Sequence, residues 1–255
     1  MTSDRVALVT GTSAGLGAAV ADVLLGGGWT VVGVARRTSA ITNPRYRHLS
    51  LDLADADSIA KIEAAIAPLL RASAIARVAL VNNAAAPGPL APIEEIEPQA
   101  LARLYAVNVI APVALMGLAV RRTPADAALR IVNVSSGAAV GAYPGLAAYS
   151  SSKAALRMAG MVLAAELESE KRKNRAPHDA AILSYEPGAV DTDMQTHARS
   201  LSPDVFPWVE MFHAFVARGI LVPPAVPAAE IVRFVESDGH PRFSDARLLL
   251  VSGQS

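Results

Sequence analysis

Tyr149 and Lys153 stand four residues apart at the start of a strongly helical pattern. This spacing places the two side chains on one face of a helix, where the ammonium group can stabilise a tyrosinate. A free tyrosine has a pKa of about 10, so proton transfer by tyrosine at neutral pH needs a fixed cation close by. The pair therefore predicts a tyrosine acid-base catalyst, although the spacing alone is common and usually has no meaning.

Ser136 lies thirteen residues before Tyr149, at the end of the apolar run Ile131–Ser135. A hydroxyl at the carboxyl end of a buried strand is well placed to donate a hydrogen bond to a substrate carbonyl. A serine hydrolase is the alternative use of such a group. No G-x-S-x-G elbow surrounds Ser136, and none of the five histidines has a recognisable triad context.

A glycine-rich turn, Thr10–Gly17, follows the first apolar run of the chain and precedes a helical pattern. Gly11 permits a tight turn, and Gly15 and Gly17 let the backbone approach a pyrophosphate at the N-terminus of the helix. Three glycines can also make an ordinary turn, and only their place between a strand and a helix indicates a dinucleotide site.

The second strand ends in Arg36 and Arg37, where a site for NAD would place an acidic residue. An arginine can bind a 2′-phosphate bidentately, so the sequence favours NADP(H). Arg36 is expected to be the main contact and Arg37 an additional one. Both could instead be solvated loop charges. Asp52 could accept a hydrogen bond from the adenine amino group or cap a helix.

The elements that would position these groups alternate along the chain. Strands are expected at 6–10, 30–35, 48–51, 78–82, 131–135, 181–185 and 248–251, and helices at 15–27, 57–71, 99–121, 149–170 and 227–237. Several strands are apolar on both faces, which is typical of a parallel sheet covered by helices. The pattern predicts a Rossmann-like, doubly wound α/β fold.

Six motifs lie in the order and at the spacings of the short-chain dehydrogenase/reductase family, which the chain resembles over nearly its whole length. They are Thr10-Gly11-x-x-x-Gly15-x-Gly17, Asn82-Asn83-Ala84, Asn108, Ser136, Tyr149-x-x-x-Lys153 and Pro187-Gly188-x-Val190-x-Thr192. The resemblance implies a mainly parallel seven-stranded sheet of order 3-2-1-4-5-6-7. The family usually reads Asn-Asn-Ala-Gly, and Ala85 replaces that glycine here.

The resemblance also implies a role for each catalytic residue. Tyr149 protonates the substrate oxygen, Ser136 positions it, Lys153 lowers the tyrosine pKa and holds the nicotinamide ribose, and Asn108 orders a proton-relay water. The residues expected to bind the cofactor are Gly11, Ser13, Gly15, Leu16, Gly17, Arg36, Arg37, Asp52, Leu53, Asn82, Ala84, Tyr149, Lys153, Pro187, Gly188, Val190 and Thr192.

The run Ser184–Gln195 is similar to the sepiapterin reductase and benzil reductase branch, which indicates reduction of a dicarbonyl or aromatic ketone. Sepiapterin reductases carry an acidic residue near the final strand, and the expected strand 248–251 has none, so a broader carbonyl reductase is favoured. Substrate contacts are expected from Ser136, Tyr149, Met194 and Trp208. The last two lie in a Pro- and aromatic-containing excursion, about 194–226, that is interpreted as a lid rather than a surface insertion.

The amino-acid composition argues against several kinds of site and several classes of protein. There is no cysteine and the formal net charge is +0, so disulfides, cysteine metal sites and a nucleic-acid footprint are not expected. The densest basic run, 171–175, is interpreted as a solvated helix end. The apolar stretch 109–120 is too short to span a bilayer, and strand-like sequence begins at Arg5, so a cytoplasmic protein without a metal is expected.

We expect a single domain over 1–255, because no linker or repeat divides the chain. The resemblance implies a dimer or tetramer in which the helices 99–121 and 149–170 pair between subunits. Two alternatives to a carbonyl reductase stay open, a catalytically silent dinucleotide sensor and a 3-oxoacyl carrier-protein reductase. A sensor would have no use for the proton-transfer residues, and the sequence shows no obvious basic docking surface for a carrier protein.

Overall fold

The protein is built on one parallel β-sheet, shown in a computed structural model that describes residues 4–71, 74–169 and 176–248. Within those ranges the sheet has seven strands in the order β3-β2-β1-β4-β5-β6-β7, so the predicted fold class and strand order are confirmed. The strands are β1 (Arg5–Thr10), β2 (Thr30–Ala35), β3 (Tyr46–Ser50), β4 (Arg77–Asn82), β5 (Ala128–Val134), β6 (Ala180–Glu186) and β7 (Phe243–Arg247).

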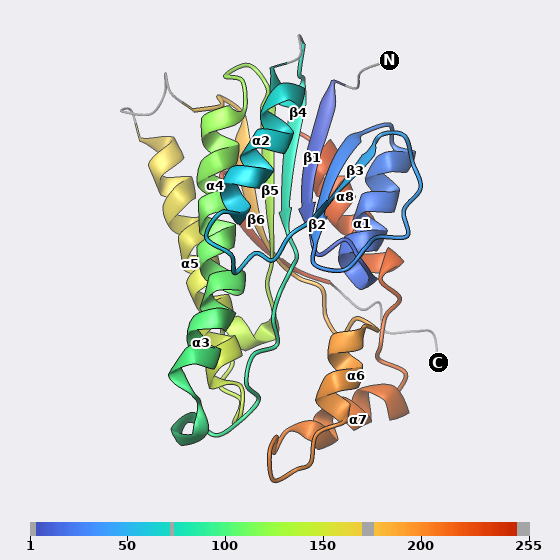
Figure 1. Cartoon of the computed structure of the whole chain (residues 1–255), viewed down its shortest axis with the longest axis vertical. Coiled ribbons are helices and arrows are strands. Elements are labelled where there is room, and N and C mark those ends of the chain that lie inside the picture. The colour runs from blue at the N-terminus through green and yellow to red at the C-terminus, as the bar shows by residue number, and fades with distance from the viewer. Residues whose placement is uncertain (1–3, 72–73, 170–175, 249–255) are drawn as a thin grey trace.

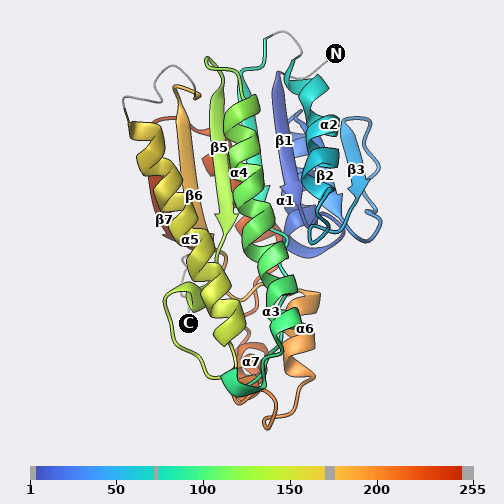
Figure 2. The ribbon, with the colours of Figure 1, turned by 60° about the vertical axis from the view of Figure 1, so that its left-hand side comes forward.

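Helices cover both faces of the sheet (Figures 1 and 2). On one face α1 (Gly15–Gly26) and α8 (Ala225–Glu236) pack on the strands, and the other face carries α2 (Ser58–Leu70), α4 (Ala111–Arg122) and α5 (Ala147–Glu168). Each face has its own buried apolar cluster. The central strands are therefore apolar on both sides, as doubly covered parallel strands must be.

A long helical run forms the element expected at 99–121. It consists of α3 (Pro98–Tyr105), a π-helical turn (Ala106–Ile110) and α4. The run has 25 residues, and an 18-residue window within it has a mean hydropathy of 1.7, so by length and composition it could cross a membrane, unlike the shorter stretch 109–120 considered above. Leu115 and Met116 of this run are buried against the sheet. The core helix of a globular protein can have the same length and hydropathy as a membrane-spanning helix.

The last strand differs from its expected position. The structure places β7 at Phe243–Arg247, ahead of the expected strand at 248–251; Leu248 is not part of a strand, and residues 249–251 lie outside the described ranges. The apolar leucine run looked more strand-like, but pairing with β6 selects a more polar segment, which an edge strand tolerates because it is covered less completely. The basic run 171–175 also lies outside the described residues.

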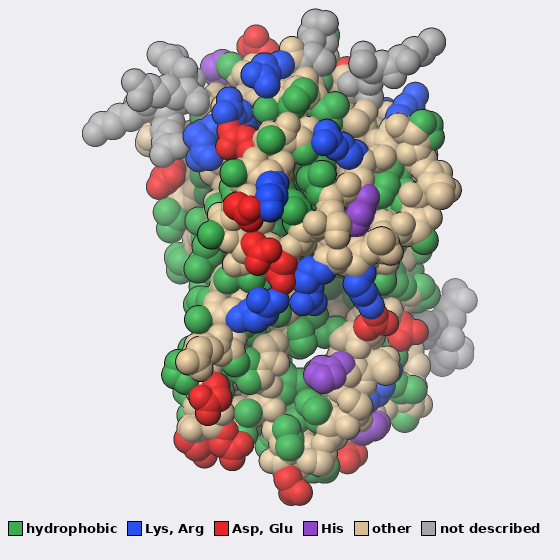
Figure 3. All heavy atoms as spheres, viewed as in Figure 1, with side chains coloured by type: hydrophobic (Ala, Val, Ile, Leu, Met, Phe, Trp, Pro, Cys, Tyr) green, Lys and Arg blue, Asp and Glu red, His purple; other side chains and the backbone are tan. Residues whose placement is uncertain are grey.

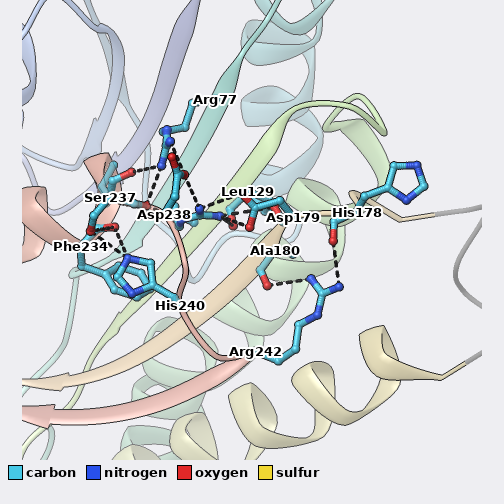
Figure 4. A network of polar contacts seen from close by, with 12 residues as sticks. Arg77, Leu129, His178, Asp179, Ala180, Phe234, Ser237, Asp238, His240 and Arg242 are labelled. Carbon is cyan, nitrogen blue, oxygen red and sulfur yellow. Dashed lines mark hydrogen bonds and ion pairs between the residues drawn. The ribbon is translucent and has the colours of Figure 1, made fainter.

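The edge of the sheet where the strands begin is held by a buried arginine (Figure 4). Arg130 on β5 is 0% exposed and forms ion pairs with Asp179 at 2.8 Å and Asp238 at 3.0 Å. Arg77 on β4 binds Asp238 and two carbonyl oxygens at the C-terminal end of α8, those of Val235 and Ser237. These contacts fix the segments before β6 and after α8 on the sheet, and they leave the opposite edge free for a site.

The segment expected to form a lid lies beyond that opposite edge, where the strands end (Figure 1). It contains α6 (Asp193–Arg199) and α7 (Val209–Ala217). A β-bridge between Val190 and Val222 joins the two ends of the excursion, with the Asp191 amide donating to the Val222 carbonyl at 3.0 Å. The excursion is therefore a closed loop with its own helices.

Candidate active site

The glycine-rich turn between β1 and α1 is closely packed. Gly11 has a φ of +80°, and a Cβ there would stand 2.5 Å from Asn83 Nδ2. A Cβ on Gly17 would stand 2.3 Å from the Gly11 carbonyl oxygen. Only glycine fits either position, and the turn ends at the N-terminus of α1, whose N–H groups suit a pyrophosphate.

The turn lies against the segment that follows β6. A Cβ on Gly15 would stand 3.1 Å from Thr192 Cγ2, so the structure brings the first and last of the predicted cofactor motifs together. Gly188, in the same segment, has a φ of +71°. The residues present fit a dinucleotide, because the two backbone segments form opposite sides of one cradle at the carboxyl edge of the sheet.

Asn83 is the residue that supports this turn, and the sequence-based site did not include it. Its Nδ2 donates to the Thr10 carbonyl at 2.9 Å, while the amides of Asn83 and Ala84 each donate to Thr10 Oγ1 at 3.0 Å. Asn82, which was expected near the adenosine, is buried and donates to Asn133 Oδ1 at 2.9 Å between β4 and β5. The doubled asparagine in the motif was the available signal for Asn83.

The arginines after β2 are exposed. Arg37 Nη2 lies 3.2 Å from Asp193 Oδ2 at the start of α6, so this ion pair connects the segment after β2 to the segment after β6. Arg36 acts on Asp52 through its charge, which helps to lower the pKa of that carboxyl. Figure 3 shows basic and acidic side chains in a band across this face, above a hollow in the lower half of the molecule.

Asp52, at the predicted adenine position, has two partners. Its Oδ1 accepts from the Ala54 amide at 2.9 Å and its Oδ2 from Arg103 Nη2 at 2.6 Å. The Ala54 amide is the main cause that lowers the pKa of this carboxyl, and Arg103 and Arg36 add to the effect. Arg103 was missed because it lies 51 residues later, on α3, and nothing in the sequence links it to Asp52.

Tyr149 and Lys153 lie in the first turns of α5 and face the end of β5. Lys153 is 3% exposed, and its Nζ donates to the Val134 carbonyl at 2.8 Å and lies 5.6 Å from the centre of the Tyr149 ring. Burial lowers the pKa of Lys153 to about 8. Burial also raises the pKa of Tyr149 to about 12, an effect that a hydrogen bond with Ser136 partly offsets.

Ser136 lies directly after β5 and meets Tyr149 there. Its Oγ accepts from the Ala138 amide at 3.2 Å, which caps a short 3₁₀ turn, and its interaction with the tyrosine hydroxyl acts to lower the pKa of Tyr149. A carbonyl oxygen placed between the two hydroxyls could accept from both. Three of the predicted catalytic residues therefore meet at one point.

Asn108 lies in the π-helical turn, and its side chain is occupied by protein groups. Oδ1 accepts from the Ala86 amide at 2.8 Å, and Nδ2 donates to the Ala86 carbonyl at 3.0 Å and to Ser152 Oγ at 3.1 Å. Three of its four hydrogen-bonding positions are taken. The side chain thus joins the helix to the 85–86 segment and α5, and a water bound here would use mainly backbone groups freed by the π-helical turn.

An apolar cluster covers Tyr149 from the side of α6 and α7. Its buried members are Leu90, Leu146, Ala198, Phe206 and Val209, with Tyr143, Tyr149, Leu201, Trp208 and Phe212 packed against them. Trp208 is half-buried and meets Tyr143 edge-on at 5.4 Å, and Met194 is half-buried on α6. Phe206 is 0% exposed, so it belongs to the interior of this lid cluster and not to a ligand surface.

The fold and this arrangement define a nicotinamide-dependent oxidoreductase, and comparison with known proteins gives the family. Residues 5–202 match the short chain dehydrogenase family. The chain belongs to this family of oxidoreductases, whose members bind a nicotinamide dinucleotide. The predicted resemblance is confirmed.

Several reductases are similar to the chain over most of its length. A benzil reductase ((S)-benzoin forming) of Bacillus cereus is 30% identical over 96% of this chain and 99% of its own. A D-erythrulose reductase of Gallus gallus is 34% identical over 74% of this chain and 73% of its own. A sepiapterin reductase of Bos taurus is 28% identical over 76% of this chain and 70% of its own.

Solved structures agree with the fold. A short chain dehydrogenase/reductase from Saccharomyces cerevisiae has a TM-score of 0.80 and 26% identity over 94% of this chain and 95% of its own. Two structures below 25% identity, which show the fold alone, contain different cofactors. A 4-hydroxyisoleucine dehydrogenase holds NADH (18%; 98% of this chain, 100% of its own; TM-score 0.67), and a metagenomic oxidoreductase holds NADP (22%; 98% and 99%; TM-score 0.67).

The position of β7 bears on a possible pterin site. The final strand does contain an acidic residue, Asp245, contrary to the expectation from 248–251. Asp245 is paired with Arg157 of α5, with Oδ1 and Oδ2 accepting from the guanidinium at 3.1 and 2.5 Å. Its carboxylate is thus occupied within the protein.

Proposed function

We propose that the protein reduces a ketone or dicarbonyl to an alcohol with NADPH, and that Tyr149 is the general acid. The meeting of the Tyr149 and Ser136 hydroxyls above the buried Lys153 ammonium carries this proposal. When bound, the dihydronicotinamide supplies a hydride to the carbonyl carbon. The Tyr149 hydroxyl gives its proton to the developing alkoxide, and the Ser136 hydroxyl donates a hydrogen bond to the same oxygen.

The electrostatics of the pair favour the acid form of the tyrosine. Its raised pKa keeps the proton on Tyr149 throughout the neutral range before the reaction. The Lys153 ammonium then stabilises the tyrosinate that remains after transfer, and the Val134 carbonyl fixes the position of the ammonium. Asn108 holds α3, α4 and α5 in register around this point.

NADPH is proposed over NADH because β2 is followed by Arg36 and Arg37 and not by an acid. Arg36 would hold the 2′-phosphate. Gly11, Ser13, Gly15, Leu16 and Gly17 would hold the pyrophosphate side, Asp52, Leu53 and Ala84 the adenosine side, and Lys153, Pro187, Gly188, Val190 and Thr192 the nicotinamide side.

A ketone with an apolar substituent is the proposed substrate. The lid cluster packs on Tyr149, so one side of a bound carbonyl would meet aromatic and aliphatic side chains. Met194 and Trp208 are half-buried and can contact it. The names of the similar reductases, which act on benzil, D-erythrulose and sepiapterin, support carbonyl reduction.

Tyr149→Phe tests the proposed acid. The variant lacks the transferable proton, so we expect turnover of benzil or an aryl ketone to fall by about a thousandfold or more, within the usual range for acid catalysis and its electrostatic support. NADPH affinity, measured by fluorescence titration, should change little. Unchanged turnover would contradict the assignment, and tight NADPH binding by a wild-type protein that consumes none across a ketone panel would favour a sensor.

Arg36→Ala tests the cofactor. Losing charged hydrogen bonds to a phosphate should weaken NADPH binding by about 10- to 100-fold and leave NADH binding nearly unchanged. Arg37→Ala is the matched control and should have a smaller effect, because Arg37 already pairs with Asp193. Equal losses for the two coenzymes would show that Arg36 does not bind the 2′-phosphate.

A homo-oligomer that pairs α4 and α5 between subunits is also proposed. Exposed apolar side chains occur on these two helices and on the π-helical turn before α4: Ile110 is 64% and Met158 54% exposed, and Val113 and Val162 are exposed as well. Such a surface supports burial against a second copy.

A further inference from the structure

An acidic side chain stands beside the proposed reaction centre without a part in the proposed proton transfer. Glu186 is the last residue of β6 and directly precedes Pro187. The register of β5 and β6 places Val134 opposite Tyr185, and the Ser135 amide donates to the Tyr185 carbonyl at 2.7 Å. Glu186 is therefore next to the turn that carries Ser136.

The carboxylate of Glu186 lies on the backbone of this turn. Its Oε1 would stand 2.7 Å from a Cβ built on Gly137, so the carboxylate lies where a side chain at this position would be. Arg247, at the end of β7, places Nη2 at 3.1 Å from the same oxygen. Two strands and the serine turn thus fix the position of the acid.

The two charges of this pair are exposed to different degrees. The Glu186 side chain is 20% exposed and that of Arg247 is 70% exposed, so the negative end lies inward, next to Gly137, and the positive end faces solvent. Solvent screens the inner charge less than the outer one. A group near Ser136 therefore meets a local negative field and a carboxylate oxygen able to accept a hydrogen bond.

A carbonyl held between Ser136 and Tyr149 has two substituents on opposite sides. The substituent on the side of Tyr149 meets the apolar lid cluster. The substituent on the side of Ser136 would point toward Gly137, the next residue, against which the Glu186 carboxylate lies. The site is thus asymmetric, with an apolar side and an acidic side.

We propose that Glu186 is a specificity-determining residue that favours ketones with a hydroxyl next to the carbonyl and rejects 2-oxo acids. The hydroxyl donates to the carboxylate, whereas a substrate carboxylate is repelled by it. This inference rests on the proposed function, because it assumes reduction at Tyr149 and Ser136. It adds the chemical class of the second substituent.

Three phenyl ketones of nearly equal size test the proposal: 2-hydroxyacetophenone, propiophenone and phenylglyoxylate. Their common phenyl group fits the lid side, and the other substituent is a hydroxymethyl, an ethyl or a carboxylate. In the wild type, kcat/KM should be highest for the hydroxyketone and lowest for phenylglyoxylate.

Glu186→Gln keeps the shape and an acceptor but removes the charge. We expect kcat/KM for phenylglyoxylate relative to propiophenone to rise about tenfold or more. Glu186→Leu removes the acceptor, so the preference for the hydroxyketone over propiophenone should fall about tenfold. Asp245→Asn is the control, since it removes one negative charge from β7 at the Arg157 pair, and both ratios should stay within about twofold.

Arg247→Met gives a second readout if the Glu186 variants fail to fold. It removes the compensating cation, so discrimination against phenylglyoxylate should increase. Ratios that stay constant in the Glu186 and Arg247 variants of an active enzyme would overturn the inference. A wild type that reduces none of the three ketones with either coenzyme would instead overturn the proposed function.

Discussion

At the scale of single residues, the site places two titratable groups side by side, a buried Lys153 and a half-buried Tyr149. Burial moves the pKa of Lys153 down from 10.5 to about 8 and that of Tyr149 up from 10.0 to about 12. Both shifts favour the neutral form, so the cofactor-free protein holds a protonated tyrosine beside an ammonium group that is easily deprotonated. Burial of the Lys153 ammonium lowers the free energy of unfolding, as is common for ionisable groups at functional sites.

This cost predicts a pH effect on unfolding. Below about pH 8 Lys153 is charged in both the folded and the unfolded states, and burying the ammonium costs roughly 3 kcal/mol. Between about pH 8 and 10.5 the unfolded chain binds more protons, so the free energy of unfolding contributed by this residue rises with pH.

Lys153→Met removes the titrating group and tests the effect. In denaturant unfolding of the cofactor-free protein, the variant should be more stable relative to wild type at about pH 7 than at about pH 10, with a change of up to about 3 kcal/mol. Measurements stop near pH 10 because above it Tyr149 binds its proton more tightly in the folded state and stability falls with pH. Lys61→Met, on the exposed face of α2, should show no such trend.

At the scale of elements, the segment after β6 joins the cofactor cradle to the lid. Thr192 lies against Gly15, and the next residue, Asp193, starts α6 and pairs with Arg37. Phe206 anchors the far part of the lid cluster and lies near Gly145, where a Cβ would stand 3.1 Å from its ring. The lid is therefore held at both its cofactor side and its substrate side.

Phe206→Ala should loosen the lid while the sheet stays intact. The lost packing of about 3 kcal/mol or more falls on a cluster separate from the two that cover the sheet. We expect the KM for propiophenone to rise about tenfold and the Kd for NADPH to change less than about twofold. Val216→Ala, on the exposed side of α7, is the control. A parallel loss of NADPH affinity would show that the lid and the cradle are one unit.

At the scale of the whole molecule, the two ends of the parallel strands have different roles. The edge where the strands begin is fixed by Arg130 and its two aspartates, and the edge where they end carries the site. The outer surfaces of α4 and α5 connect the two edges and expose apolar side chains.

Met158→Lys tests subunit pairing through these helices. A charge at the centre of a buried apolar contact is costly, so the oligomer measured by sedimentation should dissociate to a smaller species. Val23→Lys places the same charge on an exposed valine of α1 and should leave the oligomer unchanged. If the Met158 variant sediments as the wild type does, the contact lies elsewhere.

Local chemistry in the sequence determined the fold class, the strand order implied by its motifs and the meeting of Tyr149, Lys153 and Ser136. Apolar strands, glycines with required conformations and helical spacing are short-range signals, and they can be recognised in the sequence without knowledge of the fold. β7 could not be located in the same way, because an edge strand is selected by its partner β6 and not by its own composition.

Contacts between residues far apart in the chain were decided only by the tertiary structure. Asp52 with Arg103, Arg37 with Asp193 and Glu186 with Arg247 are each brought together by the crossing of different βα units. No periodicity encodes such pairs. The sequence thus determined that a tyrosine and a lysine lie together at the end of a parallel sheet, and the packing of the sheet decided which charges surround them.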